Sequence, residues 1–328
     1  MMKRVRWGVI STADIAQTQV IPAILRSEHA ELAAIASRSS KVKEVAKAFS
    51  IPYAYDSYEE LLINPEIEAI YIPLPNHLHK KWVIEAAKAG KHILVEKPAA
   101  LTAAEAEEMV AICQEKNVKF MEAFMYQFHP QHKRVQEIIA SGEIGEIKFM
   151  RTGFSYLLEN RKTNIRMNKE MGGGSIYDIG CYCIHAIRNL LGSEPVTIKA
   201  FAEIDPETQI DVSAVVHMKL ENGITCVFDS SFEMSFRNEY EIVGTKGRII
   251  VPNAYRPDVV GPDAVIHIGE RSERIAGDSY KLQIDHFSKA IIEDFEPSYS
   301  INNTLQNMRI IDSCYQSIKS KRAVSLSS

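Results

Sequence analysis

Glu96-Lys97-Pro98 is the segment of this sequence best suited to proton chemistry. It ends the short apolar run His92–Val95, which is typical of a buried parallel strand. Open α/β sheets bind ligands at the carboxyl ends of such strands. A lysine that is partly removed from water there has a lowered pKa, which suits it to proton transfer. The alternative is that Glu96 and Lys97 form an exposed charged pair at the end of a strand.

A second group of chemically useful residues follows the three glycines at 172–174, which predict a flexible or backbone-exposing loop. Asp178, Tyr182 and His185 recur at spacings of four and three, so they lie near one face of a helix. An acid beside a phenol can orient a hydroxyl-bearing substrate and share a proton with it. The alternative is that Asp178 caps a helix and Tyr182 packs in the core. We expect His185 to be a packed histidine with its hydrogen bonds satisfied, rather than a catalytic one.

The first apolar run, Val5–Ile10, leads into a turn of small residues and then a helix. Such a turn lets a pyrophosphate approach the backbone N–H groups and the positive helix N-terminus. Ser11, Ala13 and Ala16 stand where the Gly-x-Gly-x-x-Gly pattern has glycines, so an ordinary small-residue turn is the alternative. Ser11 and Thr12 alternatively serve as helix caps. The candidate cofactor-binding residues of this turn are Gly8, Ser11, Thr12, Ala13 and Ile15.

The end of the second predicted strand bears on which dinucleotide would bind. NAD sites usually carry an acidic residue there for the ribose hydroxyls. This chain has Ser37 and Arg38 instead, with Lys41 and Lys43 beyond them. A hydroxyl and a guanidinium suit a phosphate, which a carboxylate would repel. The pattern therefore favours NADP, with NAD as the other candidate, and the alternative is a solvated basic helix start.

The third predicted strand ends at two prolines, the second of which is Pro75, and Asn76 or His77 can cap the helix that follows. The pair His77 and His79 raises the question of a metal. Residues two apart point to different sides of a helix, and neither cysteines nor a carboxylate cluster lie nearby in the sequence. We expect no metal site.

The pattern of predicted strands and helices that position these residues differs between the two parts of the chain. The first third alternates short apolar strands with helices, which predicts a doubly wound parallel sheet. Ser57-x-x-Glu60 and Thr102-x-x-Glu105 match the capping box at two helix starts, and Pro22 is expected to kink or split the first helix. The predicted strands are Val5–Ile10, Leu32–Ala36, Ala69–Ile72, His92–Val95 and Val118–Met121. The predicted helices are Ala13–Arg26, Lys41–Phe49, Tyr58–Ile63, Leu78–Ala89 and Ala103–Glu115.

After about residue 122, long strand-like runs predict a second domain of α+β type with an antiparallel sheet. Glu221-Asn222-Gly223 joins two of the strands as a hairpin turn. The predicted strands are Ile147–Tyr156, Thr197–Glu203, Val212–Leu220, Ile224–Phe232, Glu239–Val243, Arg248–Pro252 and Val265–Ile268. The predicted helices are Gln131–Ala140, Leu282–Ile292 and Thr304–Lys319. We therefore divide the chain into residues 1–122 and 123–328.

Composition excludes several classes of protein. The chain has 328 residues, of which 46% are hydrophobic and 24% charged, so it can build two ordinary globular cores. A formal net charge of -4 gives no basic surface for nucleic acid. No apolar run approaches the length of a membrane helix, and we see no signal peptide. Five cysteines without Cys-x-x-Cys spacing are typical of reduced thiols, so we expect a cytoplasmic protein.

Taken together, these segments resemble the glucose–fructose oxidoreductase, inositol dehydrogenase and rhizopine catabolism (GFO/IDH/MocA) family over essentially the whole chain. The resemblance is carried by the Gly8–Ala16 turn, Pro75-Asn76-x-x-His79, Glu96-Lys97-Pro98, and Gly172-Gly-Gly through Asp178-x-Gly180-x-Tyr182. It implies a Rossmann domain followed by a domain with a large, open-faced, mainly antiparallel sheet. It also implies that Lys97 is the catalytic lysine, that Asp178 and Tyr182 line the substrate site, and that Pro75, Asn76, His79, Glu96 and Lys97 contribute to the cofactor site.

Many members of the family have histidine at the position of Tyr182. Tyrosine there, with Met121-Glu122-Ala123, resembles the branch with xylose dehydrogenase and dimeric dihydrodiol dehydrogenase. We expect an NADP(H)-dependent dehydrogenase or reductase that acts on a sugar, polyol or vicinal diol, and that forms a homodimer or higher homo-oligomer through the second sheet. The alternative is a non-catalytic, dinucleotide-binding regulatory protein on the same fold. The substrate itself and the direction of the reaction are not predicted.

Overall fold

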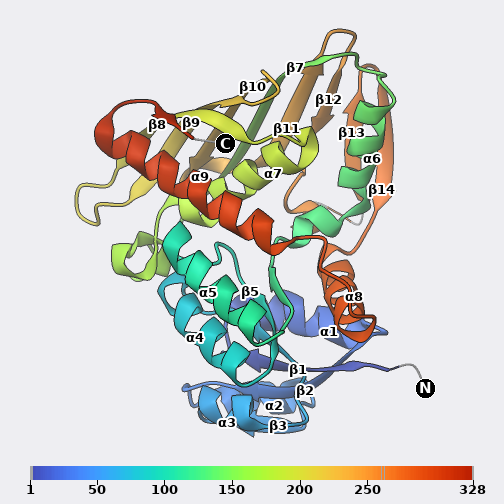
Figure 1. Ribbon diagram of the computed structural model, residues 1–328, viewed down its shortest axis with the longest axis vertical. Helices are drawn as coiled ribbons and strands as arrows, with labels where there is room; N and C mark the ends of the chain where they lie inside the picture. Colours follow the sequence, from blue (N-terminus) through green and yellow to red (C-terminus); the bar gives the residue numbers. More distant parts are fainter. Residues whose placement is uncertain (1–2, 260, 262, 327–328) are drawn as a thin grey trace. The chain divides into compact units, whose positions relative to one another are not determined.

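The computed structural model describes residues 3–259, 261 and 263–326 (Figure 1). Its contacts divide the chain into two compact units, one of residues 1–125 with 279–308 and one of residues 126–278 with 309–328. The segment 279–308 joins the first unit because the indole Nε1 of Trp7 donates to Ser288 Oγ at 3.1 Å and the Trp7 ring packs on Phe287. Compact units are not functional domains, so the domain division at residue 122 stays a prediction.

The first unit is a parallel sheet. Its strands pair, within the described residues, in the order β3-β2-β1-β4-β5-β6, which is the Rossmann order. The strands are β1 (Val5–Ile10), β2 (Ala30–Ala36), β3 (Tyr53–Tyr55), β4 (Ala69–Ile72), β5 (His92–Val95) and β6 (Phe120–Glu122). Strand β4 is buried throughout and β5 nearly so, because helices cover both faces. The order reverses between β1 and β4, so ligands are expected beyond the carboxyl ends of these central strands.

Helices begin at the signals seen in the sequence. Ser57 and Thr102 accept hydrogen bonds from the backbone N–H groups of Glu60 and Glu105, as the capping boxes predict. The first predicted helix is split, because a π-helical turn at Ala16–Val20 precedes α1. The helices are α1 (Ile21–Arg26), α2 (Val42–Ala48), α3 (Tyr58–Ile63), α4 (Asn76–Lys88), α5 (Ala103–Glu115) and α8 (Ser279–Ile292). Figure 1 shows α4 and α5 side by side, and α4 lies against β4 and β5.

The second unit is built on a larger sheet. Its strands pair, in the described part of the chain, in the order β14-β13-β12-β11-β7-β10-β9-β8-β15. Pairing is antiparallel except between β10 and β7, and Gly223 turns the β9–β10 hairpin with a φ of 83°. The strands are β7 (Ile147–Leu157), β8 (Pro195–Ile204), β9 (Asp211–Leu220), β10 (Thr225–Ser231), β11 (Glu233–Gly244), β12 (Arg248–Val251), β13 (Asp263–Ile268), β14 (Arg271–Ala276) and β15 (Val324–Ser325). The predicted fold class, a Rossmann sheet followed by a mainly antiparallel sheet, is confirmed.

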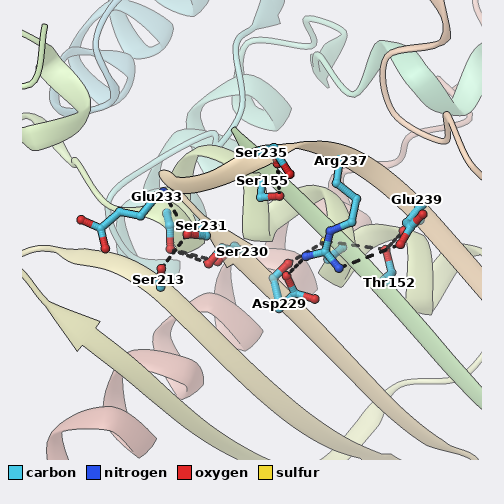
Figure 2. A network of polar contacts seen from close by, with 12 residues as sticks. Thr152, Ser155, Ser213, Asp229, Ser230, Ser231, Glu233, Ser235, Arg237 and Glu239 are labelled. Atoms are coloured by element: carbon cyan, nitrogen blue, oxygen red, sulfur yellow. Dashed lines mark hydrogen bonds and ion pairs between the residues drawn. The ribbon is translucent and has the colours of Figure 1, made fainter. Parts of the chain in front are cut away.

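The two faces of this sheet differ. Helix α7 (Cys181–Leu191) lies against β7 and β10, and α6 (Pro130–Ala140) lies against β13 and β14. The C-terminal part of α9 (Ile301–Ser320) belongs to the same unit. On the opposite face, charged side chains alternate along the strands. Figure 2 shows Arg237 of β11 between Asp229 of β10 and Glu239. We call this side of the sheet, which also carries Arg151, the open face.

Candidate functional site

The turn after β1 has the donor groups that a dinucleotide phosphate needs. Ser11 adopts a φ of 95°, and its N–H donates to Ala36 O at 2.7 Å, which ties the turn to the end of β2. The helix then begins at Asp14, and Ala16 N and Gln17 N donate to Ala13 O at 3.0 and 3.2 Å. The N–H groups just before Ala16 come too early in the helix to have a helical acceptor. These donors and the positive helix end fit an anionic pyrophosphate. Thr12, Ala13 and Ile15 lie in or directly after this turn, and their contacts with a cofactor stay a prediction.

Gly8 has a packing role in this turn. A Cβ added at Gly8 would lie 2.9 Å from Leu61 Cδ2 and 3.0 Å from Ile70 Cδ1. A larger residue would therefore require the ends of these side chains to move, and Gly8 shapes the turn through the packing of the strand that leads into it.

Ser37 and Arg38 lie at the end of β2 in different environments. Ser37 is 5% exposed, and its Oγ accepts from Ser39 N at 3.1 Å. The Arg38 side chain is 59% exposed, and its Nη2 lies 3.9 Å from Oε1 of Glu59, which is also exposed. Its guanidinium lies 5.0 Å from the centre of the Tyr58 ring and 5.5 Å from that of Trp82. The two aromatic rings hold a planar cation that solvent can reach, a geometry suited to binding a phosphate group.

Lys97 follows β5 and is partly buried, and its peptide bond to Pro98 is cis. The neighbouring carboxylate of Glu96 accepts from the hydroxyl of Tyr71 at 2.6 Å. Tyr71 lies in β4, whose end approaches that of β5 in the parallel register. Lys97 is thus held next to a fixed carboxylate at the carboxyl edge of the sheet.

Two buried side chains fix the backbone just after Lys97. His79 is fully buried, and its ring nitrogens lie 3.0 Å from Pro98 O and 2.7 Å from Leu74 O. Burial lowers the pKa of His79 to about 4, so the ring is neutral at pH 7 and donates to one of these carbonyls at a time. Glu122, which is also fully buried, accepts from Ala99 N at 2.9 Å. His79 therefore supports the backbone next to Lys97 through its contact with Pro98 O inside the core.

The residues that the sequence predicts for substrate binding lie in the second unit. Asp178 sits in a π-helical turn, Ile176–Gly180, that precedes α7. Its Oδ2 accepts from Tyr156 OH at 2.6 Å and from Arg166 Nε at 2.8 Å. Arg166 and Asp178 form an ion pair, and the Coulombic attraction of Asp178 raises the pKa of Arg166. A carboxylate held by two donors in this way has a fixed direction.

Tyr182 lies one turn further on, in the first turn of α7. It is 6% exposed and is surrounded by the rings of Tyr126, Phe154 and Tyr255, with ring centres 5.5–5.7 Å away. His185 is buried, and its Nδ1 lies 2.6 Å from the hydroxyl of Tyr126. His185 is therefore packed in the core, as expected, and the absence of a catalytic role stays a prediction.

The glycine run before Asp178 is closely packed. Gly174 donates from N to Arg166 O at 3.0 Å, and Gly173 donates to Asn168 O at 2.8 Å. A Cβ added at Gly173 would collide with Arg166 O. The sequence predicts a flexible or backbone-exposing loop, whereas the structure has the glycines packed: they permit close backbone contacts that place Arg166 beside Asp178.

The structure adds three residues that the sequence did not single out for the site. Tyr156 is the last residue of the predicted strand and the residue before the end of β7, but nothing in the pattern indicates that its hydroxyl reaches Asp178. Arg166 lies in a loop without periodicity and gave no signal. Glu122 was noted only as part of a motif, and a carboxylate inside an apolar strand is the signal that would have marked it.

Other features of the described residues limit the chemistry. Nowhere in the described ranges do three or more His, Cys, Asp or Glu side chains gather so that they could hold a metal ion. The five cysteines, all of them described, are buried free thiols. None of the helices that the structure describes is long and apolar enough to cross a membrane.

Comparison with known proteins agrees with this geometry. Residues 5–124 match the model of the oxidoreductase family with an NAD-binding Rossmann fold, and residues 132–250 match the GFO/IDH/MocA C-terminal domain. The chain is 35% identical to D-xylose 1-dehydrogenase (NADP(+)) 2 of Haloferax volcanii, over 98% of this chain and 99% of the relative. It is 32% identical to trans-1,2-dihydrobenzene-1,2-diol dehydrogenase of Xenopus tropicalis, over 87% and 82% of the two chains. Among solved structures, the aldose-aldose oxidoreductase of Caulobacter crescentus complexed with glycerol superposes with a TM-score of 0.91 at 26% identity, covering 99% of this chain and 100% of that one.

Proposed function

Because the chain belongs to the GFO/IDH/MocA family of oxidoreductases, we propose that it is an NADP(H)-dependent enzyme that transfers a hydride between the nicotinamide and a sugar, polyol or vicinal-diol carbon. The family predicted from the sequence is confirmed, and the relatives include both enzyme types of the predicted branch. Their names support a sugar-like or diol substrate, because one acts on D-xylose and the other on a dihydrodiol.

The observation that carries this proposal is the way Lys97 is held. A lysine in a flexible loop could not present its ammonium group to a substrate oxygen in one geometry. Here the backbone after Lys97 is tied through Pro98 O to His79 and through Ala99 N to Glu122. Such preorganisation is what a proton-transfer group needs and what an exposed surface lysine lacks.

Each proposed catalytic residue has a separate role. When bound, the nicotinamide supplies or accepts the hydride. Lys97 and Tyr182 hold and move the proton of the substrate oxygen. Asp178, with its direction fixed by Tyr156 and Arg166, orients the substrate hydroxyls.

NADP is the proposed cofactor because of Arg38. Its exposed guanidinium, flanked by Tyr58 and Trp82, provides the charge-assisted hydrogen bonds that a ribose phosphate accepts. The name of the Haloferax relative, which includes NADP(+), supports the same choice. Ser11, Thr12, Ala13, Ile15, Ser37, Pro75, Asn76 and Glu96 complete the proposed cofactor site, and Gly8 and His79 support it from the core.

The test is a screen of oxidation and reduction with NADP(H) and NAD(H) over aldoses, inositols and vicinal diols. The proposal expects turnover of at least one substrate, faster with NADP(H). The alternative, a dinucleotide-binding regulatory protein, has no observation in its favour here; it would bind NADPH, as seen by fluorescence, without consuming it under any substrate.

We also propose a homodimer or higher oligomer formed through the open face. On that face Phe201 and Val215 face each other across β8 and β9, and they are 62% and 50% exposed. An apolar pair next to charges of both signs suits a second copy of the same surface. Sedimentation at micromolar concentration should show an oligomer, and Phe201→Glu should weaken it; a monomeric parent would contradict the proposal. The five buried free thiols support the cytoplasmic location that we propose.

A further inference from the structure

Asp211, at the start of β9, is a carboxylate with only 2% of its surface exposed. Ser175 Oγ at 2.9 Å and Ile176 N at 2.8 Å donate to its Oδ2. The hydroxyl of Tyr315, from the part of α9 in the same unit, donates to its Oδ1 at 2.8 Å. Burying a charge is unfavourable unless donors surround it in this way. Three donors have therefore been assembled around one buried charge.

The residues that Asp211 holds lie inside the link between Arg166 and Asp178. Gly174 N donates to Arg166 O, and Asp178 N donates to Gly174 O, each at 3.0 Å. Residues 174–176 therefore connect the two partners of the ion pair. Gly174 has a φ of 130°, and a Cβ there would collide with Asp211 Oδ1, so this link can approach the carboxylate only with glycine at that position.

We propose that Asp211 is a positioning residue for the substrate end of the site: its negative charge holds residues 174–176 so that Asp178 meets the substrate in one geometry, and uptake of a proton by Asp211 loosens this hold. The inference rests on the proposed function, in which Asp178 orients the substrate.

The chemistry of the donors explains why the charge matters. Hydrogen bonds to an ionised acceptor are stronger than those to a neutral one. A protonated Asp211 must also donate its own proton. The hydroxyls of Ser175 and Tyr315 can rotate to accept it, but the N–H of Ile176 cannot. A protonated Asp211 therefore forms weaker hydrogen bonds with residues 175 and 176 than the ionised carboxylate does.

Burial raises the pKa of Asp211 to about 6, against the opposing effect of hydrogen bonds from Ile176, Tyr315 and Ser175. A folded-state pKa above the unfolded value means that the favourable contribution of Asp211 is complete below the unfolded pKa. It is lost as the pH rises through the folded pKa. The ionised side chain therefore lowers stability at neutral pH. Charges that are retained in spite of such a loss are typical of functional sites.

The groups that face Asp211 do not titrate in the same range. They are Tyr315 and Cys314 of α9, Ser175 and Ile176 of the turn, and Ser230 of β10, whose Oγ lies 2.9 Å from Ser175 Oγ. Burial raises the pKa of Tyr315 and that of Cys314, so both stay neutral from pH 5 to 8. The Arg166–Asp178 pair lies at the far end of the link. Asp211 is thus the group here that changes charge near pH 6.

The first test is Asp211→Asn, which removes the charge and keeps the shape. The amide oxygen can face Ser175 and Ile176 while the amide nitrogen donates to Tyr315. We expect a thermal midpoint at pH 7.5 that is no lower than that of the parent, and a kcat/KM lower by about tenfold, the equivalent of a 1.4 kcal/mol weaker hold. The parent should lose kcat/KM as the pH falls below about 6, and the variant should lack this loss. Asp205→Asn, in the turn before β9, is the matched control and should keep the parent profile.

The second test does not depend on turnover. Amide hydrogen exchange of Ile176 and Asp178 is measured in the cofactor-free protein and corrected for the intrinsic effect of pH. For an opening that releases the turn and leaves Asp211 buried at the start of β9, only the hydrogen bonds to the carboxylate are lost. Protection should then be higher at pH 7.5 than at pH 5 in the parent and equal at both in Asp211→Asn. If protection in the parent does not depend on pH, the inference is overturned, whatever the activity. A lower midpoint with unchanged kcat/KM in the variant would also overturn it, because Asp211 would then be purely structural. If amide exchange shows the expected protection but no substrate in the screen is turned over, the proposed function is overturned and the inference about Asp211 is not.

Discussion

Arg166 donates from Nε to Oδ2 of Asp178 at 2.8 Å, which pairs the proposed substrate-orienting acid with a cation that is 40% exposed. The variant Arg166→Gln removes the positive charge of residue 166. Of the two donors to Asp178 Oδ2, Arg166 Nε and Tyr156 OH, the Tyr156 hydroxyl then remains. We expect KM for the substrate to rise by about tenfold, the scale of one charge-assisted hydrogen bond. Affinity for NADP, measured by fluorescence titration, should change less than twofold. Arg161→Gln, which removes an ion pair with Glu233, is the control; an unchanged KM in Arg166→Gln would contradict the role of the pair.

Arg38 should discriminate between the two cofactors. Arg38→Ala removes a charge-assisted contact of about 1.5–3 kcal/mol, so NADP should bind tens of fold more weakly while NAD binding barely changes. Lys43→Ala removes another charge from the same region, where Lys43 pairs with Asp56 at 3.9 Å, and should have little effect on either affinity. Calorimetric titration with both cofactors measures the difference. An equal loss for NADP and NAD would show that Arg38 does not bind the phosphate.

Glu122 should be important for stability because it satisfies two buried donors. Its Oε1 accepts from Ala99 N and its Oε2 from Tyr299 OH, both at 2.9 Å. Glu122→Leu leaves both donors without an acceptor, at a loss of about 1–3 kcal/mol each. Tyr299→Phe removes one donor and should destabilise the protein by about 1 kcal/mol. Denaturant unfolding compares the two variants, and equal losses would mean that Glu122 does not support the Lys97 segment.

His79 predicts a specific loss of stability in acid. Burial lowers its pKa to about 4, below the unfolded value of about 6.5, so the fold favours the neutral ring. The resulting stabilisation is complete above pH 6.5 and is lost as the pH falls toward 4; a shift of this size corresponds to about 3 kcal/mol. His79→Gln should therefore lose less stability than the parent between pH 6.5 and 4.5 in denaturant unfolding. His217→Gln, at an exposed position of β9, should follow the parent curve. If the free energy of unfolding depends on pH in the same way in the parent and in His79→Gln, the titration of His79 is not the cause of the loss in acid.

Periodicity and capping signals predicted most of the fold. Strand β5 and helix α5 have the predicted bounds, since their apolar pattern and flanking signals agree. Strands β3 and β14 were missed, because β3 has three residues and β14, Arg271–Ala276, is an edge strand rich in charges. Such strands bury too little apolar surface to show a period.

The site was predictable only in part. Motif resemblance singled out Lys97, Asp178 and Tyr182, whose roles stay proposals. The residues that hold them come from distant segments: Arg166 from an aperiodic loop, and Asp211 from the start of a strand. The spacing of Asp178 and Tyr182 was interpreted with α-helical geometry. In the structure a π-helical turn, with its i to i+5 hydrogen bonds, changes the angle between them. Sequence spacing does not reveal such a turn.

The catalytic assignment of Lys97 predicts a loss of turnover without a loss of cofactor. Lys97→Met keeps the length of the side chain and removes the ammonium group. NADP affinity should stay nearly intact, while kcat should fall by roughly two to four orders of magnitude, the scale of a lost general acid–base group.

Tyr182→Phe should also slow turnover, and the losses in the double variant should combine less than additively if the two side chains handle one proton as a unit. Tyr240→Phe is a matched control, since it removes a buried phenol hydroxyl that lies 3.1 Å from His132. Fully additive losses would mean that Lys97 and Tyr182 act in separate steps. If Lys97→Met turns over its best substrate as fast as the parent, the assignment is wrong. Glu96 and Lys97 would then be the charged pair at a strand end that is the simpler interpretation of the motif.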